Sequence, residues 1–191
     1  MTILADIKQS QSAMHELALH FDFDVGRAAR DDAWIKLAPQ QAFSVVAGDS
    51  SGGVFLAYGD GEIERRPILY VSSEGQAGRI ASSLAELLAM MMAIPAWHDL
   101  LKFSGGGNLD EMRRTAGLLE RDGPDDEEVP AATQRIVAVF SLPAIADPVR
   151  LLHDCVHASD CNVVADDGWP CESLFGHFKS SDNPFWKKDA S

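Results

Sequence analysis

The chain has 191 residues, 46% of them hydrophobic, and a formal net charge of −13. A field of this sign repels nucleic-acid phosphates and anionic membranes and steers basic partners inward, although it also serves solubility alone. Three cysteines cannot all pair within one chain, which favours a reducing compartment. The start of the chain lacks the basic region of a signal peptide, and the longest apolar run, Leu87–Ala96, falls short of the ~20 residues of a membrane span. We therefore expect a cytoplasmic protein.

The first half of the chain is predicted to form a helix followed by an antiparallel meander. Apolar residues at helical spacing predict the helix over residues 2–21. Short runs rich in Val, Ile, Phe and Tyr then alternate with Gly-containing turns. These runs predict strands at Phe43–Ala47, Val54–Tyr58 and Pro67–Ser72, with a short fourth strand at Arg79–Ala81. Because the loop between the second and third strands is too short for a parallel crossover, we expect those two strands to be adjacent and antiparallel.

A helix that covers this sheet is predicted to begin after Ser83. Ser83 and Glu86 have the spacing of a capping box, in which the two side chains satisfy the first amides of a helix. Leu84, Leu88 and Met91 follow on one helical stripe. We expect these three side chains to be buried against the sheet.

The second half of the chain is predicted to be mainly helical. Residues 121–130, RDGPDDEEVP, are interpreted as a linker, because Pro, Gly and acidic residues contribute little to a core. The run Ala131–Phe140 fits either a helix or a strand. The other predicted elements are helices at Ala96–Phe103, after Asn108 and from Asp147 to about Ala158, a strand at Asn162–Ala165, a turn at Asp166–Gly168, an apolar segment at Glu172–Phe178, and a tail anchored by Phe185 or Trp186.

These elements together indicate an α+β fold. We expect an antiparallel four- to six-stranded sheet with helices packed on it, plus a mainly helical C-terminal extension. The chain is interpreted as a single domain over residues 1–191. Within it we expect a core at about 1–120, an acidic linker at 121–130, a C-terminal lobe at 131–181 that docks back onto the core, and a loose tail at 182–191.

The sharpest chemical feature is a group of potential metal ligands near the C-terminus: His153, Cys155, His157, Cys161, Cys171 and His177. Two of these histidines are four residues apart on a predicted helix, so both imidazoles can face one metal. With Cys161 they would suit a metal-assisted hydrolase or a structural zinc site. The competing interpretation is a buried Cys155 and histidines along an exposed helix edge. Because no CxxC pair and no closed ligand tetrad is present, we expect no bound zinc and no cofactor.

Sequence patterns of other catalytic classes are weak. The glycine-rich stretches Gly48–Gly53 and Gly105–Gly107 match neither a phosphate-binding loop nor a dinucleotide fingerprint, and they are typical of turns. No GxSxG nucleophile motif occurs. These patterns favour a binding module over an enzyme.

Three segments resemble the SUKH superfamily, which includes bacterial immunity proteins and fungal cell-wall synthesis regulators. They are Phe43–Tyr58 (FSVVAGDSSGGVFLAY), Pro67–Gly75 (PILYVSSEG) and Gly78–Leu88 (GRIASSLAELL). The similarity covers about residues 40–105 and consists of strands, turn glycines and a covering helix. It implies a protein-binding role and no catalytic residues.

The charge and this resemblance lead to one expected function. We expect a non-enzymatic immunity or regulatory protein that caps a basic partner, such as a nuclease toxin. The expected contact residues are the acidic side chains in or beside the meander turns, because turns project into solvent. They are Asp49, Asp60, Glu62 and Glu74.

Overall fold

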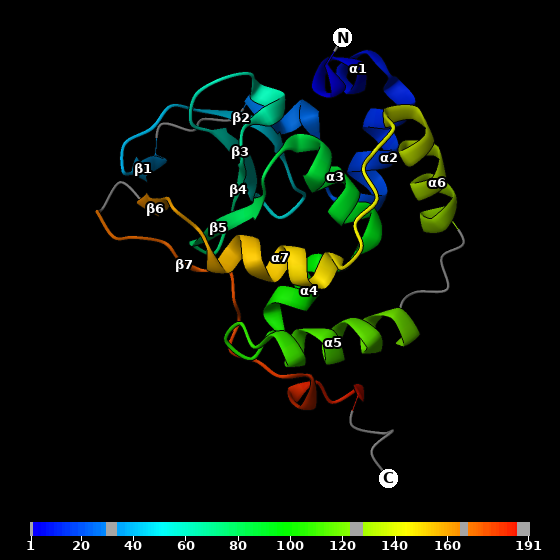
Figure 1. Cartoon of the computed structure of the whole chain (residues 1–191), viewed down its shortest axis with the longest axis vertical. Helices are drawn as coiled ribbons and strands as arrows, with labels where there is room; N and C mark the ends of the chain where they lie inside the picture. Colours follow the sequence, from blue (N-terminus) through cyan, green and yellow to red (C-terminus); the bar gives the residue numbers. More distant parts are fainter. Residues whose placement is uncertain (1, 30–33, 123–127, 165–167, 187–191) are drawn as a thin grey trace.

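The structure is a computed structural model that describes residues 2–29, 34–122, 128–164 and 168–186 (Figure 1). It confirms an α+β fold. The α-helices are α1 (Ile3–Gln9), α2 (Gln11–Phe21), α3 (Leu84–Ala93), α4 (Trp97–Lys102), α5 (Leu109–Asp122), α6 (Glu128–Phe140) and α7 (Pro148–His157). The strands are β1 (Lys36–Ala38), β2 (Phe43–Gly48), β3 (Val54–Tyr58), β4 (Ile68–Val71), β5 (Gln76–Ala81), β6 (Asn162–Val164) and β7 (Glu172–Ser173). Short 3-10 helices lie at Val25–Ala29, Ile63–Arg65 and Ser180–Asp182.

The main sheet has the strand order β2-β3-β4-β5-β7. The first four strands form the predicted antiparallel meander, and β3 pairs with β4 with Phe55 opposite Tyr70. The fourth strand is longer than predicted, because it already begins at Gln76. The fifth strand, β7, pairs with β5 in the parallel direction, so the sheet is mixed rather than wholly antiparallel. A separate ribbon of β1 and β6 is antiparallel.

Both faces of the main sheet are covered, by different kinds of structure. On one face Phe55, Ile68 and Tyr70 join a large core shared with the helices. On the other face Leu56 and Leu69 join a smaller core with residues of the β1–β6 ribbon. This double cover explains why β3 and β4 are buried along their whole length, where an exposed sheet would alternate.

The covering helix α3 follows the prediction closely. The Ser83 hydroxyl accepts a hydrogen bond from the amide of Glu86 at 3.2 Å, as the capping sequence indicated. Leu84, Leu88 and Met91 are all buried in the large core, which confirms their predicted position. The Glu86 carboxylate accepts from the amide of Ser82 at 2.6 Å. The start of α3 is therefore fixed by side chains on both sides of its first turn.

The predicted helix over residues 2–21 is in fact two helices. The chain breaks at Ser10, whose hydroxyl accepts from the amide of Ala13 at 3.2 Å and so caps the start of α2. Leu4 and Leu17, on either side of the break, are buried in the same core. A continuous apolar stripe therefore spans the break and hides it in the sequence.

The C-terminal part of the chain shares the large core instead of forming its own. Ile136 of α6 and Leu152 of α7 are buried there, and α7 lies along β5 (Figure 1). The ambiguous run Ala131–Phe140 belongs to a helix. The ends of the predicted linker are helical, because α5 continues to Asp122 and α6 begins at Glu128; its centre, residues 123–127, lies outside the described residues.

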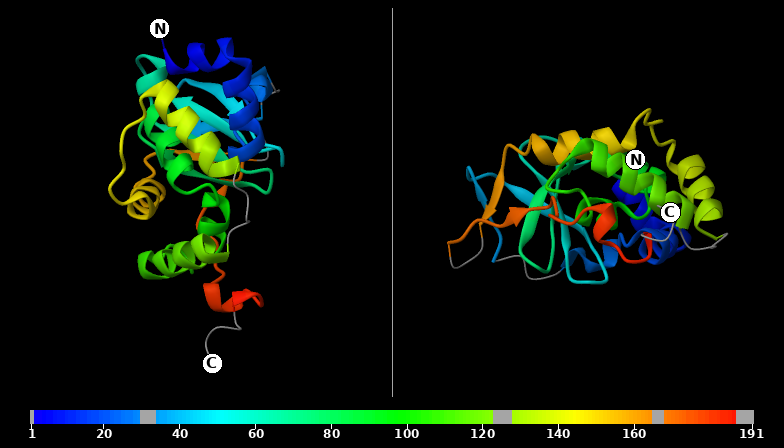
Figure 2. Two further views of the ribbon diagram at one scale, coloured as in Figure 1. Left: turned by 90° about the vertical axis from the view of Figure 1, so that its right-hand side faces the viewer. Right: turned by 90° about the horizontal axis from the view of Figure 1, so that it is seen from below.

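The remaining C-terminal predictions fall partly within the described residues. The predicted strand appears as β6, while residues 165–167 of that strand and the following turn lie outside them. Trp186 packs edge-on against Phe103, with ring centroids 5.0 Å apart, so Trp186 anchors the tail; residues 187–191 lie outside the described part of the chain. Figure 2 shows α5 and this tail at the end of the molecule opposite α1. Within the described ranges, no helix is both long and apolar enough to cross a bilayer.

Candidate binding pocket

The turn between β2 and β3 is built around Asp49. Its Oδ1 accepts hydrogen bonds from the amides of Gly52 (2.8 Å) and Gly53 (2.7 Å) and from the hydroxyl of Ser51 (2.8 Å). Its Oδ2 accepts from the Tyr70 hydroxyl on β4 at 2.5 Å. Asp49 is fully buried. The expectation that Asp49 projects into solvent as a partner contact is therefore wrong, because its carboxylate organises the turn from inside.

The surroundings of Asp49 keep it ionised. Burial raises the pKa of its carboxyl, but the hydrogen bonds from Tyr70, Ser51, Gly53 and Gly52 outweigh burial and hold the pKa below its usual value. Burial and the same carboxylate raise the pKa of Tyr70, so the phenol remains a donor. A Cβ at position 53 would lie 2.4 Å from Asp49 Oδ2, so this close approach requires glycine.

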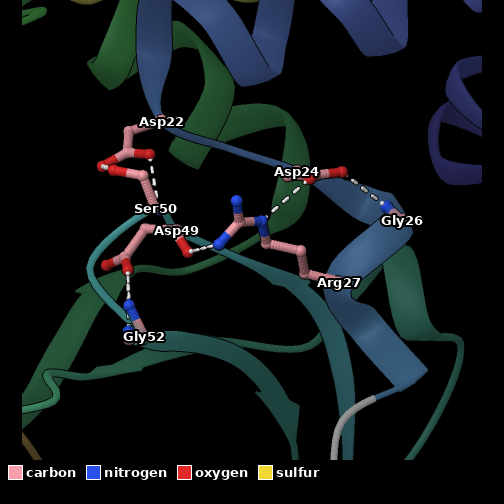
Figure 3. A network of polar contacts seen from close by, with 8 residues as sticks. Asp22, Asp24, Gly26, Arg27, Asp49, Ser50 and Gly52 are labelled. Carbon is pink, nitrogen blue, oxygen red and sulfur yellow. Dashed lines mark hydrogen bonds and ion pairs between the residues drawn. The ribbon is translucent and has the colours of Figure 1, made fainter.

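A second set of contacts holds the same turn from outside (Figure 3). The Asp22 carboxylate accepts from the amide of Ser50 at 2.7 Å and from its hydroxyl at 3.1 Å. Arg27 donates from Nη1 to the backbone carbonyl of Asp49 at 2.8 Å and from Nε to the Asp24 carboxylate at 3.0 Å. The β2–β3 turn is thus held by Tyr70 of β4 and by the segment that contains Asp22 and Arg27. The carboxylates of Asp22, Asp24 and Asp49 all accept hydrogen bonds within the protein.

The other three predicted contact residues are exposed but do not share a face. Successive turns of an antiparallel meander lie at opposite ends of the sheet. Glu74, in the β4–β5 turn, is at the end that carries Asp49, whereas Asp60 and Glu62 follow β3 at the other end. The five residues of β3 separate the two ends by on the order of 15 Å. Glu62 also lies 3.6 Å from Arg65 in an exposed ion pair.

An open pocket of about 470 Å³ lies at the Asp49 end of the sheet. Its walls come from the two turns at this end, from α4 and from the C-terminal segment Leu174–Phe178. Tyr70, Trp97 and His98 supply aromatic rings to the wall, and its exposed residues include Glu74, Lys102 and Phe178. A concave site with aromatic walls and a few polar groups is the usual form of a binding site.

His98 is held in this wall by ring contacts. Its ring stacks on Trp97 with centroids 3.6 Å apart and meets Tyr70 edge-on at 5.3 Å. Burial lowers the pKa of His98, and this effect exceeds the opposing effects of the Asp49, Asp22 and Asp99 carboxylates. The imidazole is therefore neutral near pH 7, and three carboxylates lie near enough to act on it.

The C-terminal wall of the pocket is fastened by backbone hydrogen bonds. The amide of Gly176 donates to the carbonyl of Leu101 at 2.9 Å, and the amides of Gly105 and Gly106 donate to Phe178 and Gly176, each at 2.8 Å. A Cβ at position 176 would lie 2.3 Å from the carbonyl oxygen of Lys102. The segment that completes the pocket therefore packs directly on the backbone of α4.

The predicted metal ligands are not brought together. The rings of His153 and His157 stack in parallel with centroids 5.8 Å apart, and His153 lies within hydrogen-bond distance of Asp154 and of the Gly107 carbonyl. Cys161 is buried in the smaller core beneath the β1–β6 ribbon, with Cys171 packed against it. Among the described residues, no group of three or more His, Cys, Asp or Glu side chains is placed to hold a metal ion. The alternative site of His153, His157 and Cys161 is therefore wrong in its geometry.

Glu74, which the sequence predicts to be an exposed contact residue, is exposed and lines the pocket, while the sequence did not indicate the other pocket residues. His98 and Lys102 lie in a segment that was interpreted only as a short helix, and Phe178 in one interpreted only as apolar. The sequence signal that marks this place is the run Gly105–Gly107. In the structure all three glycines have positive φ angles, and they turn the chain where the C-terminal segment docks. Comparison of the chain with protein-family models, curated proteins and solved structures gives no match.

Proposed function

We propose that this chain is a non-enzymatic protein-binding module that recognises a basic partner at the pocket end of its sheet. One observation carries the proposal: the pocket presents an exposed carboxylate, Glu74, and an exposed ring, Phe178 (56% exposed), in a chain of net charge −13. Exposed aromatic residues supply much of the binding energy at protein interfaces, and charge steers the encounter.

The serine hydroxyls in the pocket support binding over catalysis. The Ser51 hydroxyl donates to Asp49, and the Ser72 hydroxyl accepts from the amides of Glu74 (3.3 Å) and Gln76 (3.1 Å). Two of the three serine hydroxyls in the pocket wall, those of Ser51 and Ser72, therefore stabilise turns; the third belongs to Ser73. The nearby imidazole of His98 packs against rings, whereas a nucleophilic serine needs a base within hydrogen-bond reach. The SUKH resemblance extends the proposal to an immunity or regulatory role, with a basic nuclease toxin as the partner.

The test begins with the products of genes that neighbour this one. Each is purified and its binding kinetics with the chain are measured at low and at moderate salt. We expect a basic partner whose association rate falls as salt shortens the Debye length to ~8–10 Å. We further expect Glu74→Lys to slow association and Phe178→Ala to speed dissociation, both with an unchanged melting temperature.

The control is Glu62→Lys, which makes the same charge change at the opposite end of the sheet. It should alter association much less than Glu74→Lys does. An acidic partner, or a partner whose rates respond equally to both lysine variants, would contradict the proposed surface. Turnover of a substrate by the purified chain that Phe178→Ala abolishes would contradict the non-enzymatic role.

A further inference from the structure

The rings of the pocket wall differ in how far a bound group can reach them: Phe178 is exposed and His98 half-buried, whereas Trp97 and Tyr70 are buried beneath them. The rings of Trp97 and His98 are stacked with an angle of 29° between their planes, while Tyr70 meets both edge-on, at 5.1 Å from Trp97 and 5.3 Å from His98. Phe178 adds a fourth, exposed ring at the edge of the pocket. The faces of such rings carry negative electrostatic potential and attract cations, and the planar guanidinium of arginine also stacks on them.

The charges around the pocket also favour a cation. Glu74 lines the pocket and is exposed, and the carboxylates of Asp22, Asp49 and Asp99 act on His98. One lining side chain, Lys102, opposes them. Its Nζ lies 5.6 Å from the ring centroid of Phe103, which is not part of the pocket wall. Among the described residues, the pocket lining thus holds one fixed charge of each sign, Glu74 and Lys102, while the carboxylates of Asp22, Asp49 and Asp99, balanced in part by Arg27, make the surroundings of His98 acidic.

We propose that the pocket holds an arginine side chain of the bound partner, with the guanidinium against the accessible rings of Phe178 and His98 and beside the Glu74 carboxylate. This inference rests on the proposed protein-binding function, to which it adds the residue that is recognised and the place. The volume of about 470 Å³ is ample for one long side chain and its neighbouring backbone. The opposite choice, an acidic side chain bound to Lys102, would be repelled by Glu74 and by the carboxylates of Asp22, Asp49 and Asp99, which act on His98.

The test uses four blocked peptides that differ only in their central residue: Ac-Gly-X-Gly-NH₂ with X as arginine, lysine, citrulline or glutamate. Citrulline has nearly the shape of arginine without its charge. Each is titrated into the ¹⁵N-labelled full chain and followed by NMR. We expect saturable shifts of the Trp97 indole N–H and of amides in Ser72–Gln76 and Gly176–Phe178. The arginine peptide should bind most tightly, then lysine and citrulline, and glutamate should not bind.

Two charge-removing variants make the assignment sharper because they should act in opposite directions. Glu74→Gln should weaken the arginine peptide roughly two- to five-fold, and Lys102→Gln should strengthen it by a similar factor, the range measured for exposed ion pairs. The matched control, Glu62→Gln, should leave the affinity unchanged. Each variant changes one exposed side chain, so the folded spectrum should persist.

Preferential binding of the glutamate peptide, or the reverse signs for Glu74→Gln and Lys102→Gln, would overturn the inference. So would arginine-peptide shifts confined to residues outside the pocket, or equal binding of the arginine and citrulline peptides. If no peptide binds while a basic partner still depends on Glu74, the pocket inference fails and the proposed function stands. If partner binding is also indifferent to Glu74, both fail.

Discussion

The β2–β3 and β4–β5 turns lie side by side at one end of the sheet, and they use their acidic residues in opposite ways. Asp49 points inward, is fully buried and accepts hydrogen bonds from its own turn and from β4. Glu74 is exposed and lines the pocket. In sequence both are acidic residues next to Ser and Gly. The position of a carboxylate in a turn does not by itself decide whether it is structural or available.

The difference depends on which side chain satisfies the turn amides. In the β2–β3 turn that acceptor is Asp49, and register places Tyr70, opposite Phe55, within reach as a further donor. In the β4–β5 turn the same task falls to Ser72, whose hydroxyl accepts from two turn amides. Glu74 is thereby left without a structural task in its turn and is available to a partner.

Among the substitutions that test this comparison, Asp49→Ala should have the largest effect on stability. The change leaves two turn amides and the buried Tyr70 hydroxyl without their acceptor, and unsatisfied buried groups are costly. We expect the free energy of unfolding, measured with urea, to fall by about 3 kcal/mol or more. The parallel change Ser72→Ala should cost only ~1 kcal/mol, because it removes a neutral acceptor in a half-exposed turn. Similar losses for the two variants would contradict the assigned difference.

The substitution Tyr70→Phe tests only the hydrogen bond from the Tyr70 hydroxyl to the buried Asp49 carboxylate. It removes one hydrogen bond to an ionised acceptor, so we expect a loss of about 1.5–3 kcal/mol. Tyr58→Phe is the matched control, because the Tyr58 hydroxyl also donates to a carboxylate at 2.5 Å, that of Asp160, whose side chain is 64% exposed. Water can replace that donor, so its loss should be smaller. Equal losses would show that burial of Asp49 adds nothing to the contact.

The pH dependence of stability should separate Asp49 from His98. Both groups have a lowered pKa in the folded state, so each contributes stability that is complete above its unfolded pKa and is lost as the pH falls towards the folded value. For His98 the loss begins below about pH 6.5, and for Asp49 below about pH 4. The free energy of unfolding should be measured with urea across this pH range. His98→Gln should reduce its pH dependence below about pH 6.5, and Asp49→Asn should reduce its pH dependence below about pH 4. An identical profile for wild type and Asp49→Asn would contradict the ionised, hydrogen-bonded carboxylate.

The meander and its covering helix could be predicted because their signals are local. Turn glycines, short runs rich in Val, Ile, Phe and Tyr, and the Ser83 cap each depend on a few neighbouring residues, and all three agree in this segment. The break between α1 and α2 at Ser10 was not predicted because two sequence signals disagree there. Its cap is equally local, but one apolar stripe crosses it, and periodicity outweighed the capping signal.

The pocket could not be predicted in the same way, because its walls come from distant parts of the chain. The Leu174–Phe178 wall docks on α4 through backbone hydrogen bonds, which no side-chain pattern records. Similarly, the parallel pairing of β7 with β5 joins two-residue and six-residue strands that are far apart in sequence. Burial of Asp49 depends on Tyr70, which lies 21 residues later. Contacts of this kind require the tertiary structure.

The smallest expected effect is that of Glu74→Ala on stability. The β4–β5 turn keeps the Ser72 hydroxyl contacts to its amides whatever side chain stands at position 74, and the Glu74 side chain is exposed. We expect a change within about 0.5 kcal/mol in urea unfolding, as for surface substitutions away from special features. A loss above about 1 kcal/mol would show that Glu74 helps to hold the turn. In that case slower partner association in Glu74→Lys would report a distorted turn, and the charge argument for the pocket would need variants at other residues.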